Sequence, residues 1–203
     1  MIFLYKLIAH RGLVNNSVDN SKESLTNGIN SDKYIGIETD VRVTKDNIFI
    51  LYHDPLYKGK LVKQTCYKEF KKNNIITLEQ LLKIKTNKIL LLEIKDYTIN
   101  LNKLLKLLNR YNRNIYLMSF SNKVINDLKQ LHTKYKLGIL NYILNTESDY
   151  KYDFICIINT FITPELINYY KSKKIEIFSY GIKSNKSIKY NNIIYIVDNK
   201  ILK

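Results

Sequence analysis

The chain has 203 residues, of which 45% are hydrophobic and only two are proline, so we expect one domain over residues 1–203 with one substantial core. Its formal net charge of +15 comes almost entirely from lysines scattered along the chain, which argues against a dedicated nucleic-acid surface. No stretch approaches the roughly 20 apolar residues that span a bilayer. Cys66 and Cys156, far apart and without metal-type spacing, support neither a disulfide framework nor a zinc site.

The N-terminal run MIFLYKLIAH is apolar but is interrupted by Lys6. It lacks the longer apolar core and the small-residue cleavage site of a signal peptide. Together with the low cysteine content, this predicts a soluble cytoplasmic protein without a transmembrane segment. Nothing in the sequence indicates an oligomeric state.

Short apolar runs rich in β-forming residues recur along the chain and predict eight main strands. They lie at residues 3–10, 34–41, 88–95, 114–120, 135–140, 152–158, 174–180 and 193–197. The run 47–53 follows the second strand after the turn-like sequence TKDN, so it predicts an extra hairpin strand. Segments with helical spacing separate most of the main strands, and they begin at Thr77, Asn100, Ser121 and Thr163, the last of which precedes a proline.

Strands that alternate with helices indicate parallel β-α units, and eight such units predict an α/β fold, a compact closed (β/α)8 barrel. Two units are incomplete. Residues 141–152 contain only a poor helix, and the sequence NKILK after Asp198 is too short for a closing helix. A doubly wound open sheet is the structural alternative, but its usual glycine-rich phosphate loop after the first strand is absent from this sequence.

Polar side chains gather at the predicted carboxyl ends of the first three strands and after the extra hairpin. These side chains are His10, Arg11, Glu38, Asp40, His53, Glu93 and Lys95. Each alone has an ordinary explanation, such as a strand-end ion pair or a core histidine. In a barrel, however, all these ends open on the face that holds the active site. Two of the chain's three histidines fall there, whereas His132 ends a predicted helix on the outside.

Glu38 and Asp40 stand two residues apart in an apolar strand, so both carboxylates point to one face and a cation or proton must offset their repulsion. With Glu93 they offer hard oxygen ligands that suit one Mg²⁺ or Ca²⁺ ion rather than zinc. Arg11 and Lys95 would bind the remaining charge of a phosphate group. The set predicts cation-assisted cleavage of a phosphodiester, in which one histidine takes a proton from the attacking oxygen and the other gives one to the leaving oxygen.

Five short motifs stand out within residues 8–95: IAHRG at 8–12, VDNS at 18–21, IETDVRVTKDN at 37–47, YHDP at 52–55 and LLEIK at 91–95. In these motifs the chain resembles the glycerophosphodiester phosphodiesterase family, and the resemblance is most specific over this span. Thinner similarity continues in IITLEQLL at 75–82 and FSYGI at 178–182. The final YIVDN falls where the family commonly has a strand ending in Thr-Asp, so Asp198 matches that aspartate.

This resemblance implies a TIM barrel of the phospholipase C-like phosphodiesterase type. It implies Glu38, Asp40 and Glu93 as ligands of one divalent cation, and His10 and His53 as the acid/base pair. Family members commonly hydrolyse glycerophosphodiesters to sn-glycerol 3-phosphate and an alcohol. We therefore expect a hydrolase that acts on a small-molecule phosphodiester and has no nucleic-acid partner.

Three departures from the family pattern concern the substrate. Val18-Asp19 replaces the Pro-Glu of the family's first turn, although Asn20 is kept. The segment between His53 and Thr77 is too short for the insertion of larger members, and the closing helix is missing. Lysophospholipase D or sphingomyelinase D-like cleavage of a lipid headgroup is the main alternative, and an exposed apolar loop beside the site, which the sequence does not clearly show, would favour it. A non-catalytic barrel that binds anions is a further alternative, disfavoured by the intact set of site residues.

Overall fold

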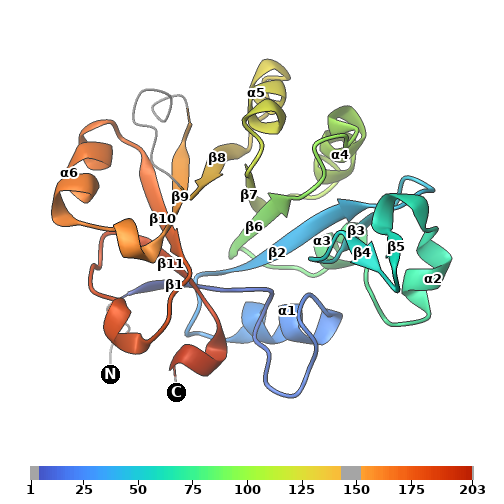
Figure 1. The fold of residues 1–203 in the computed structure, drawn as a ribbon, viewed down its shortest axis with the longest axis horizontal. Helices are drawn as coiled ribbons and strands as arrows, with labels where there is room; N and C mark the ends of the chain where they lie inside the picture. The colour runs from blue at the N-terminus through green and yellow to red at the C-terminus, as the bar shows by residue number, and fades with distance from the viewer. Residues whose placement is uncertain (1–4, 143–151, 203) are drawn as a thin grey trace.

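The barrel predicted from the sequence is present in the computed structural model, which describes residues 5–142 and 152–202 (Figure 1). Its eight parallel strands are β1 (Lys6–Ala9), β2 (Gly36–Val43), β6 (Ile89–Ile94), β7 (Asn114–Ser119), β8 (Lys136–Asn141), β9 (Phe154–Ile158), β10 (Glu176–Tyr180) and β11 (Ile194–Val197). Each strand pairs with the next, and β1 pairs with both β2 and β11, which closes the ring. The open sheet is therefore excluded.

Helices surround the strands, as Figure 1 shows. They are α1 (Lys22–Asn30), α3 (Leu78–Leu82), α4 (Leu101–Leu108), α5 (Asn122–Gln130) and α6 (Pro164–Ser172). The four helices expected from the sequence form where predicted, because Thr77, Asn100, Ser121 and Thr163 each accept a hydrogen bond from a backbone N–H of the first turn. The longest helices of the described residues have nine residues, and none of them could cross a bilayer.

The sequence reading missed helix α1. Its sequence KESLTNGIN is polar and contains a glycine, so its helical signal is weak. Two features nevertheless mark it: Ser21 caps its first turn, and Leu25 and Ile29, four residues apart, are both buried. The glycine, Gly28, lies against β2, where a Cβ atom would stand 2.7 Å from the side chain of Ile37. Close packing of helix on barrel thus explains the weak helical sequence.

The extra hairpin is present but larger than predicted. Strand β3 (Phe49–Leu51) runs antiparallel to the end of β2. It continues into the small pair β4 (Leu56–Tyr57) and β5 (Lys60–Leu61), then η1 (Val62–Gln64) and helix α2 (Tyr67–Lys71). Ile50, Tyr57, Val62 and Phe70 form a separate small core beneath this segment. The segment between β2 and α3 is therefore a packed structure rather than an open loop.

The carboxyl-terminal third also contains short 3-10 turns. They are η3 (Asn159–Phe161), η4 (Asn185–Ser187) and η5 (Asn199–Leu202). Among the described residues, η5 follows β11 directly. The poor helix expected within residues 141–152 lies almost entirely outside the described residues.

Successive side chains of each strand point alternately into the barrel interior and toward the surrounding helices. Ile8, Leu91, Phe154 and Phe178 belong to the interior cluster, whereas their strand neighbours pack in the larger core against the helices. Glu38 and Asp40 alternate with Ile37 and Val41, which belong to that outer core. The two carboxylates therefore occupy the carboxyl end of the barrel interior.

Candidate active site

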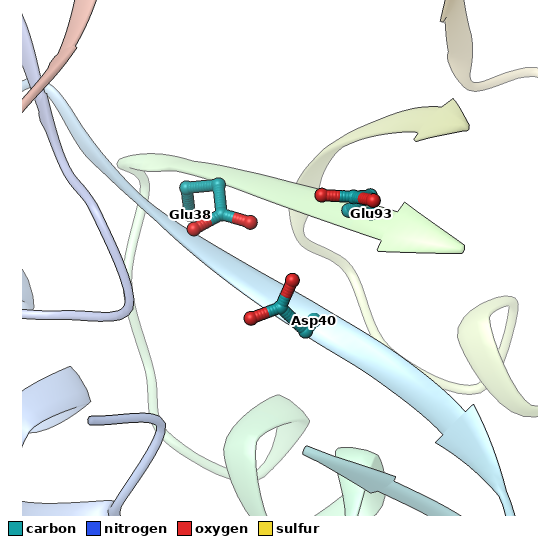
Figure 2. A group of neighbouring side chains, drawn as sticks. All are labelled: Glu38, Asp40 and Glu93. Atoms are coloured by element: carbon teal, nitrogen blue, oxygen red, sulfur yellow. The ribbon is translucent and has the colours of Figure 1, made fainter. Parts of the chain in front are cut away.

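Three buried carboxylates from two neighbouring strands face a common space (Figure 2). Glu38 and Asp40 come from β2 and Glu93 from β6, and one oxygen of each lies within 4.8 Å of the others. Asp40 and Glu93 are register partners in the parallel pair, so the sheet itself sets them side by side. The donor set consists entirely of hard oxygens, as a site for Mg²⁺ or Ca²⁺ requires.

Positive side chains compensate Asp40 in particular. Nζ of Lys95 lies 3.2 Å from one Asp40 oxygen, and Nε of Arg11 lies 3.2 Å from the other. Asn20 also donates a hydrogen bond to Asp40 at 2.9 Å. Burial alone would raise the pKa of Asp40, but Lys95, the Asn20 hydrogen bond and Arg11 together hold it below its ordinary value. Asp40 is therefore ionised at neutral pH.

Glu38 has much weaker compensation. Its nearest donors are the backbone N–H of Arg11, at 3.1 Å, and Nε2 of His10, at 3.8 Å. Burial and the neighbouring charge of Asp40 raise the pKa of Glu38 to about 8. Burial also raises the pKa of Glu93, although Lys95 lies 2.7 Å from it. The cluster thus favours a further positive charge on the side of Glu38, which a divalent cation would supply.

A tight turn after β1 points the Arg11 backbone at Glu38. Arg11 and Gly12 both have left-handed φ angles, of 53° and 86°. A Cβ atom on Gly12 would stand 2.5 Å from the carbonyl of Ser24 in α1, so only glycine fits there. The departure at Val18-Asp19 keeps this turn linked to Arg11, since Asp19 lies 3.4 Å from the Arg11 guanidinium.

His10 is oriented by a carboxylate from the far end of the chain. Its Nδ1 lies 2.7 Å from Asp198, which directly follows β11, the strand beside β1. Burial alone lowers the pKa of His10, but the Asp198 hydrogen bond and the nearby Glu38 carboxylate raise it overall. The same hydrogen bond lowers the pKa of Asp198. With Nδ1 engaged, Nε2 is the nitrogen that faces the carboxylates.

His53 is held through its backbone as well as its ring. Its Nδ1 lies 2.8 Å from the carboxylate of the next residue, Asp54. Its carbonyl accepts a hydrogen bond of 2.9 Å from Nε of Arg42, and Arg42 in turn forms a 2.7 Å ion pair with Asp96. Sequence reasoning missed Arg42 and Asp96. Their positions in the sequence could have indicated them: Arg42 directly follows Asp40-Val41 and Asp96 directly follows Lys95, on adjacent strands.

A pocket of about 270 Å³ opens above these groups. Of the predicted site residues, those that line it are His10, Arg11, Glu38, His53, Glu93 and Lys95. Asp40 does not line the pocket because it is buried beneath the others, with 1% of its surface exposed. His132 is exposed on the outer surface, as expected, and takes no part in the site.

The opposite wall of the pocket is aromatic. Phe120 follows β7 and Tyr142 follows β8, and their rings stack with centroids 4.8 Å apart. Tyr180, from the predicted FSYGI motif, meets both rings edge to face. The sequence reading assigned no role to Phe120 and Tyr142, although both directly follow barrel strands. The pocket therefore has one charged wall and one apolar wall.

Known structures share this fold along the whole chain. A Galdieria sulphuraria structure has a TM-score of 0.87 at 20% identity and covers 98% of this chain and 95% of its own. A Thermotoga maritima glycerophosphodiester phosphodiesterase has a TM-score of 0.82 at 21% identity, covering 98% and 96%. An Oleispira antarctica phosphodiesterase, solved with the product sn-glycerol-3-phosphate, has a TM-score of 0.81 at 17% identity with the same coverage, 98% and 96%.

At these identities the likeness is one of fold, and no curated protein shows significant sequence similarity to the chain. Family membership comes from the sequence pattern instead. The model of the glycerophosphoryl diester phosphodiesterase family matches residues 10–197, a span that includes His10, the carboxylate cluster and His53. The chain therefore belongs to the glycerophosphoryl diester phosphodiesterase family.

Proposed function

We propose that this protein hydrolyses glycerophosphodiesters to sn-glycerol 3-phosphate and an alcohol, with one divalent cation and with His10 and His53 as the acid/base pair. The observation that carries the proposal is one pocket lined by both histidines, by Glu38 and Glu93, and by the cations Arg11 and Lys95. The product-bound phosphodiesterase of the same fold supports the choice of substrate.

Glu38, Asp40 and Glu93 would hold the cation. Their oxygens converge within 4.8 Å, and the raised pKa of Glu38 reflects negative charge without a full partner. When bound, the cation would offset this charge and polarise the phosphoryl group of the substrate. Mg²⁺ and Ca²⁺ both suit an all-oxygen donor set.

The histidines would move the protons of the reaction. Each has Nδ1 beside a carboxylate, Asp198 for His10 and Asp54 for His53, so each keeps Nε2 for the substrate. One imidazole would take a proton from the attacking oxygen, and the other would give a proton to the oxygen of the leaving alcohol. The raised pKa of His10 favours its imidazolium form and hence the role of proton donor.

Arg11 and Lys95 would hold the phosphate against the carboxylates. Both line the pocket, and both lie 3.2 Å from Asp40, which fixes their charged ends. Their positive charge would stabilise the additional negative charge that develops on phosphate oxygens during cleavage. Lys95 is held in its charged form because Glu93 and Asp40 outweigh the effect of burial and raise its pKa.

A lysophospholipase D-like activity is the second candidate, and the aromatic wall of Phe120, Tyr142 and Tyr180 favours it. Such a wall suits a substrate with an apolar portion next to the phosphodiester. Glycerophosphocholine and lysophosphatidylcholine contain the same diester and differ in one acyl chain, so a direct comparison of their turnover separates the candidates.

The test is product release from glycerophosphocholine, glycerophosphoethanolamine, lysophosphatidylcholine and sphingomyelin, each with Mg²⁺, Ca²⁺ or a chelator. With a cation we expect release of glycerol 3-phosphate from the two glycerophosphodiesters, or of its acylated form from lysophosphatidylcholine, and no release with chelator. His132→Ala is a matched control because this histidine is exposed and remote from the pocket. No release from any diester with either cation would leave the anion-binding barrel as the better explanation.

A further inference from the structure

Large apolar side chains are exposed around the mouth of the pocket. Among the described residues, nine large hydrophobic side chains are exposed, and six of them lie on segments that follow barrel strands. We call these six the apolar rim: Val18, Leu56, Tyr97, Phe120, Tyr142 and Phe161. Because the strands of the barrel are parallel, the segments that directly follow them lie at the same end of the barrel, where the pocket opens. Leu56 follows the antiparallel strand β3 instead, and it comes three residues after His53, which lines the pocket.

Pocket lining and position in the chain link most of the rim to the pocket. Phe120 and Tyr142 line the pocket themselves. Tyr97 lies two residues after Lys95, and the segment that contains Leu56 borders the same groove as Lys95 and Tyr97. Val18 lies two residues before Asn20, which donates its hydrogen bond to Asp40. Five of the six rim residues therefore line the pocket or lie close in the chain to residues of the site.

The degree of exposure in the rim is high. Val18 is 75% exposed, Tyr97 70% and Tyr142 62%. Single exposed apolar residues are ordinary on a soluble protein, but a group of six around one opening marks an interaction surface. The remaining three are elsewhere: Ile35 precedes β2 and Leu131 follows α5, at the opposite end, and Tyr169 lies on α6.

The charge of the rim is positive. Exposed lysines stand in the same segments, at Lys58, Lys60 and Lys63 after His53 and at Lys183 and Lys186 after β10. None of these lysines forms an ion pair with another described residue. Four of the loop carboxylates, in contrast, lie beside a basic side chain: Asp19 beside Arg11, Asp54 beside His53, Asp96 beside Arg42 and Asp198 beside His10.

We propose that the apolar rim and its lysines dock the pocket onto an anionic lipid surface, from which a single-chain glycerophospholipid enters. Apolar side chains that insert between headgroups, together with lysines that meet anionic headgroups, are the two contributions that hold a protein at such a surface. The stacked Phe120 and Tyr142 would contact the acyl-bearing part of the substrate. The choice of substrate rests on the proposed function, whereas the docking does not.

The test is co-sedimentation with vesicles of phosphatidylcholine and phosphatidylglycerol at a ratio of about two to one, compared with pure phosphatidylcholine. The double variant Leu56→Ser/Tyr97→Ser removes rim side chains that do not line the pocket. Its control, Ile35→Ser/Leu131→Ser, removes two less exposed apolar side chains, 37% and 39% exposed, at the opposite end. We expect the wild type and the control to bind the anionic vesicles, and the rim variant to bind about tenfold more weakly.

Turnover of soluble glycerophosphocholine, measured in parallel, separates the two proposals. We expect the rim variant to keep wild-type turnover of this substrate and to lose at least about tenfold in turnover of lysophosphatidylcholine presented in the anionic vesicles. Equal vesicle binding by the rim variant and the wild type, or equal binding to neutral and anionic vesicles, would overturn the docking. Vesicle binding without turnover of any diester would overturn the proposed function and leave the docking in place.

Discussion

The carboxylate of Asp198 lies 2.7 Å from Nδ1 of His10, although 188 residues separate them in the chain. The pairing exists because β11 and β1 are neighbours in the closed barrel, with Val197 in register with Ala9. It fixes the orientation of the imidazole and stabilises its protonated form, which raises the pKa of His10. We therefore expect Asp198 to act through His10 rather than on the substrate.

Asp198→Asn tests this positioning role. We expect the pKa of His10 to fall, because the variant removes the negative charge that stabilises the imidazolium. The limb of the pH–rate profile that reports loss of the His10 proton should move to lower pH, and kcat should fall by about tenfold to a hundredfold. NMR titration of His10 measures the pKa directly. Asp32→Asn, on an exposed residue, is the control, and an unchanged His10 pKa in Asp198→Asn would contradict the assignment.

Arg42→Met tests the positioning of His53. The substitution removes the hydrogen bond to the His53 carbonyl and leaves Asp96, which is largely buried, without its partner. We expect kcat to fall by about tenfold or more with little change in KM, because the proton-transfer geometry is lost while phosphate binding remains. Arg42→Lys should restore only part of kcat, since lysine cannot bridge two acceptors in the same way. A rise in KM alone would argue against this role.

His10→Ala and His53→Ala should each reduce turnover by at least about a hundredfold. Cation affinity, measured by calorimetry, should remain close to that of the wild type, because neither histidine belongs to the carboxylate cluster. His132→Ala should change neither quantity. Loss of cation binding in either site variant would show that the histidine is a ligand rather than a proton carrier.

Glu38→Gln and Asp40→Asn should have opposite effects on stability in the presence of a chelator. Glu38 lies among like charges with little compensation, so Glu38→Gln should raise the free energy of unfolding by about 1–2 kcal/mol. Asp40→Asn removes the buried carboxylate that Lys95 and Arg11 share, and it should lower the free energy of unfolding by about 3 kcal/mol. Both variants should lose most of the stabilisation that added Mg²⁺ or Ca²⁺ gives the wild type. Urea unfolding with and without cation measures these changes, and effects of the same sign in chelator would contradict the charge assignment.

The stability of the cation-free protein should depend on pH in a way that Glu38 controls. Its folded pKa of about 8 lies above its ordinary value of 4.5, so the folded state holds this proton more tightly. The favourable contribution is complete below the lower value and is lost as the pH rises from about 4.5 through about 8. His10, whose pKa is also raised, contributes in the same direction. Between pH 5 and pH 9 the urea midpoint should therefore fall more steeply with pH in the wild type than in Glu38→Gln, and the difference in slope is the contribution of Glu38. The same slope in both proteins would refute the raised pKa of Glu38.

Much of the fold was predictable because the barrel strands are buried on both faces. Such strands are continuous apolar runs, and all eight lie within three residues of their predicted bounds where the structure describes them. Helix α1 escaped prediction because Gly28 and its polar sequence serve packing against β2 rather than helical propensity. The size of the segment after β3 was not predicted, because its small core is formed by residues scattered along the sequence, such as Tyr57 and Phe70.

The sequence by itself determined that His10, Glu38, Asp40, His53 and Glu93 stand at strand ends, since residue periodicity reports which positions are buried. Only the tertiary structure decided how these groups differ in ionisation and in charge compensation. Asp40 is ionised and Glu38 is not fully compensated because Lys95 and Arg11 lie against one carboxylate and not the other. It also decided that Asp198 lies beside His10 and that the exposed rings of Phe120 and Tyr142 line the pocket. Charge state and exposure depend on distances between segments far apart in the chain, and only the closed barrel sets those distances.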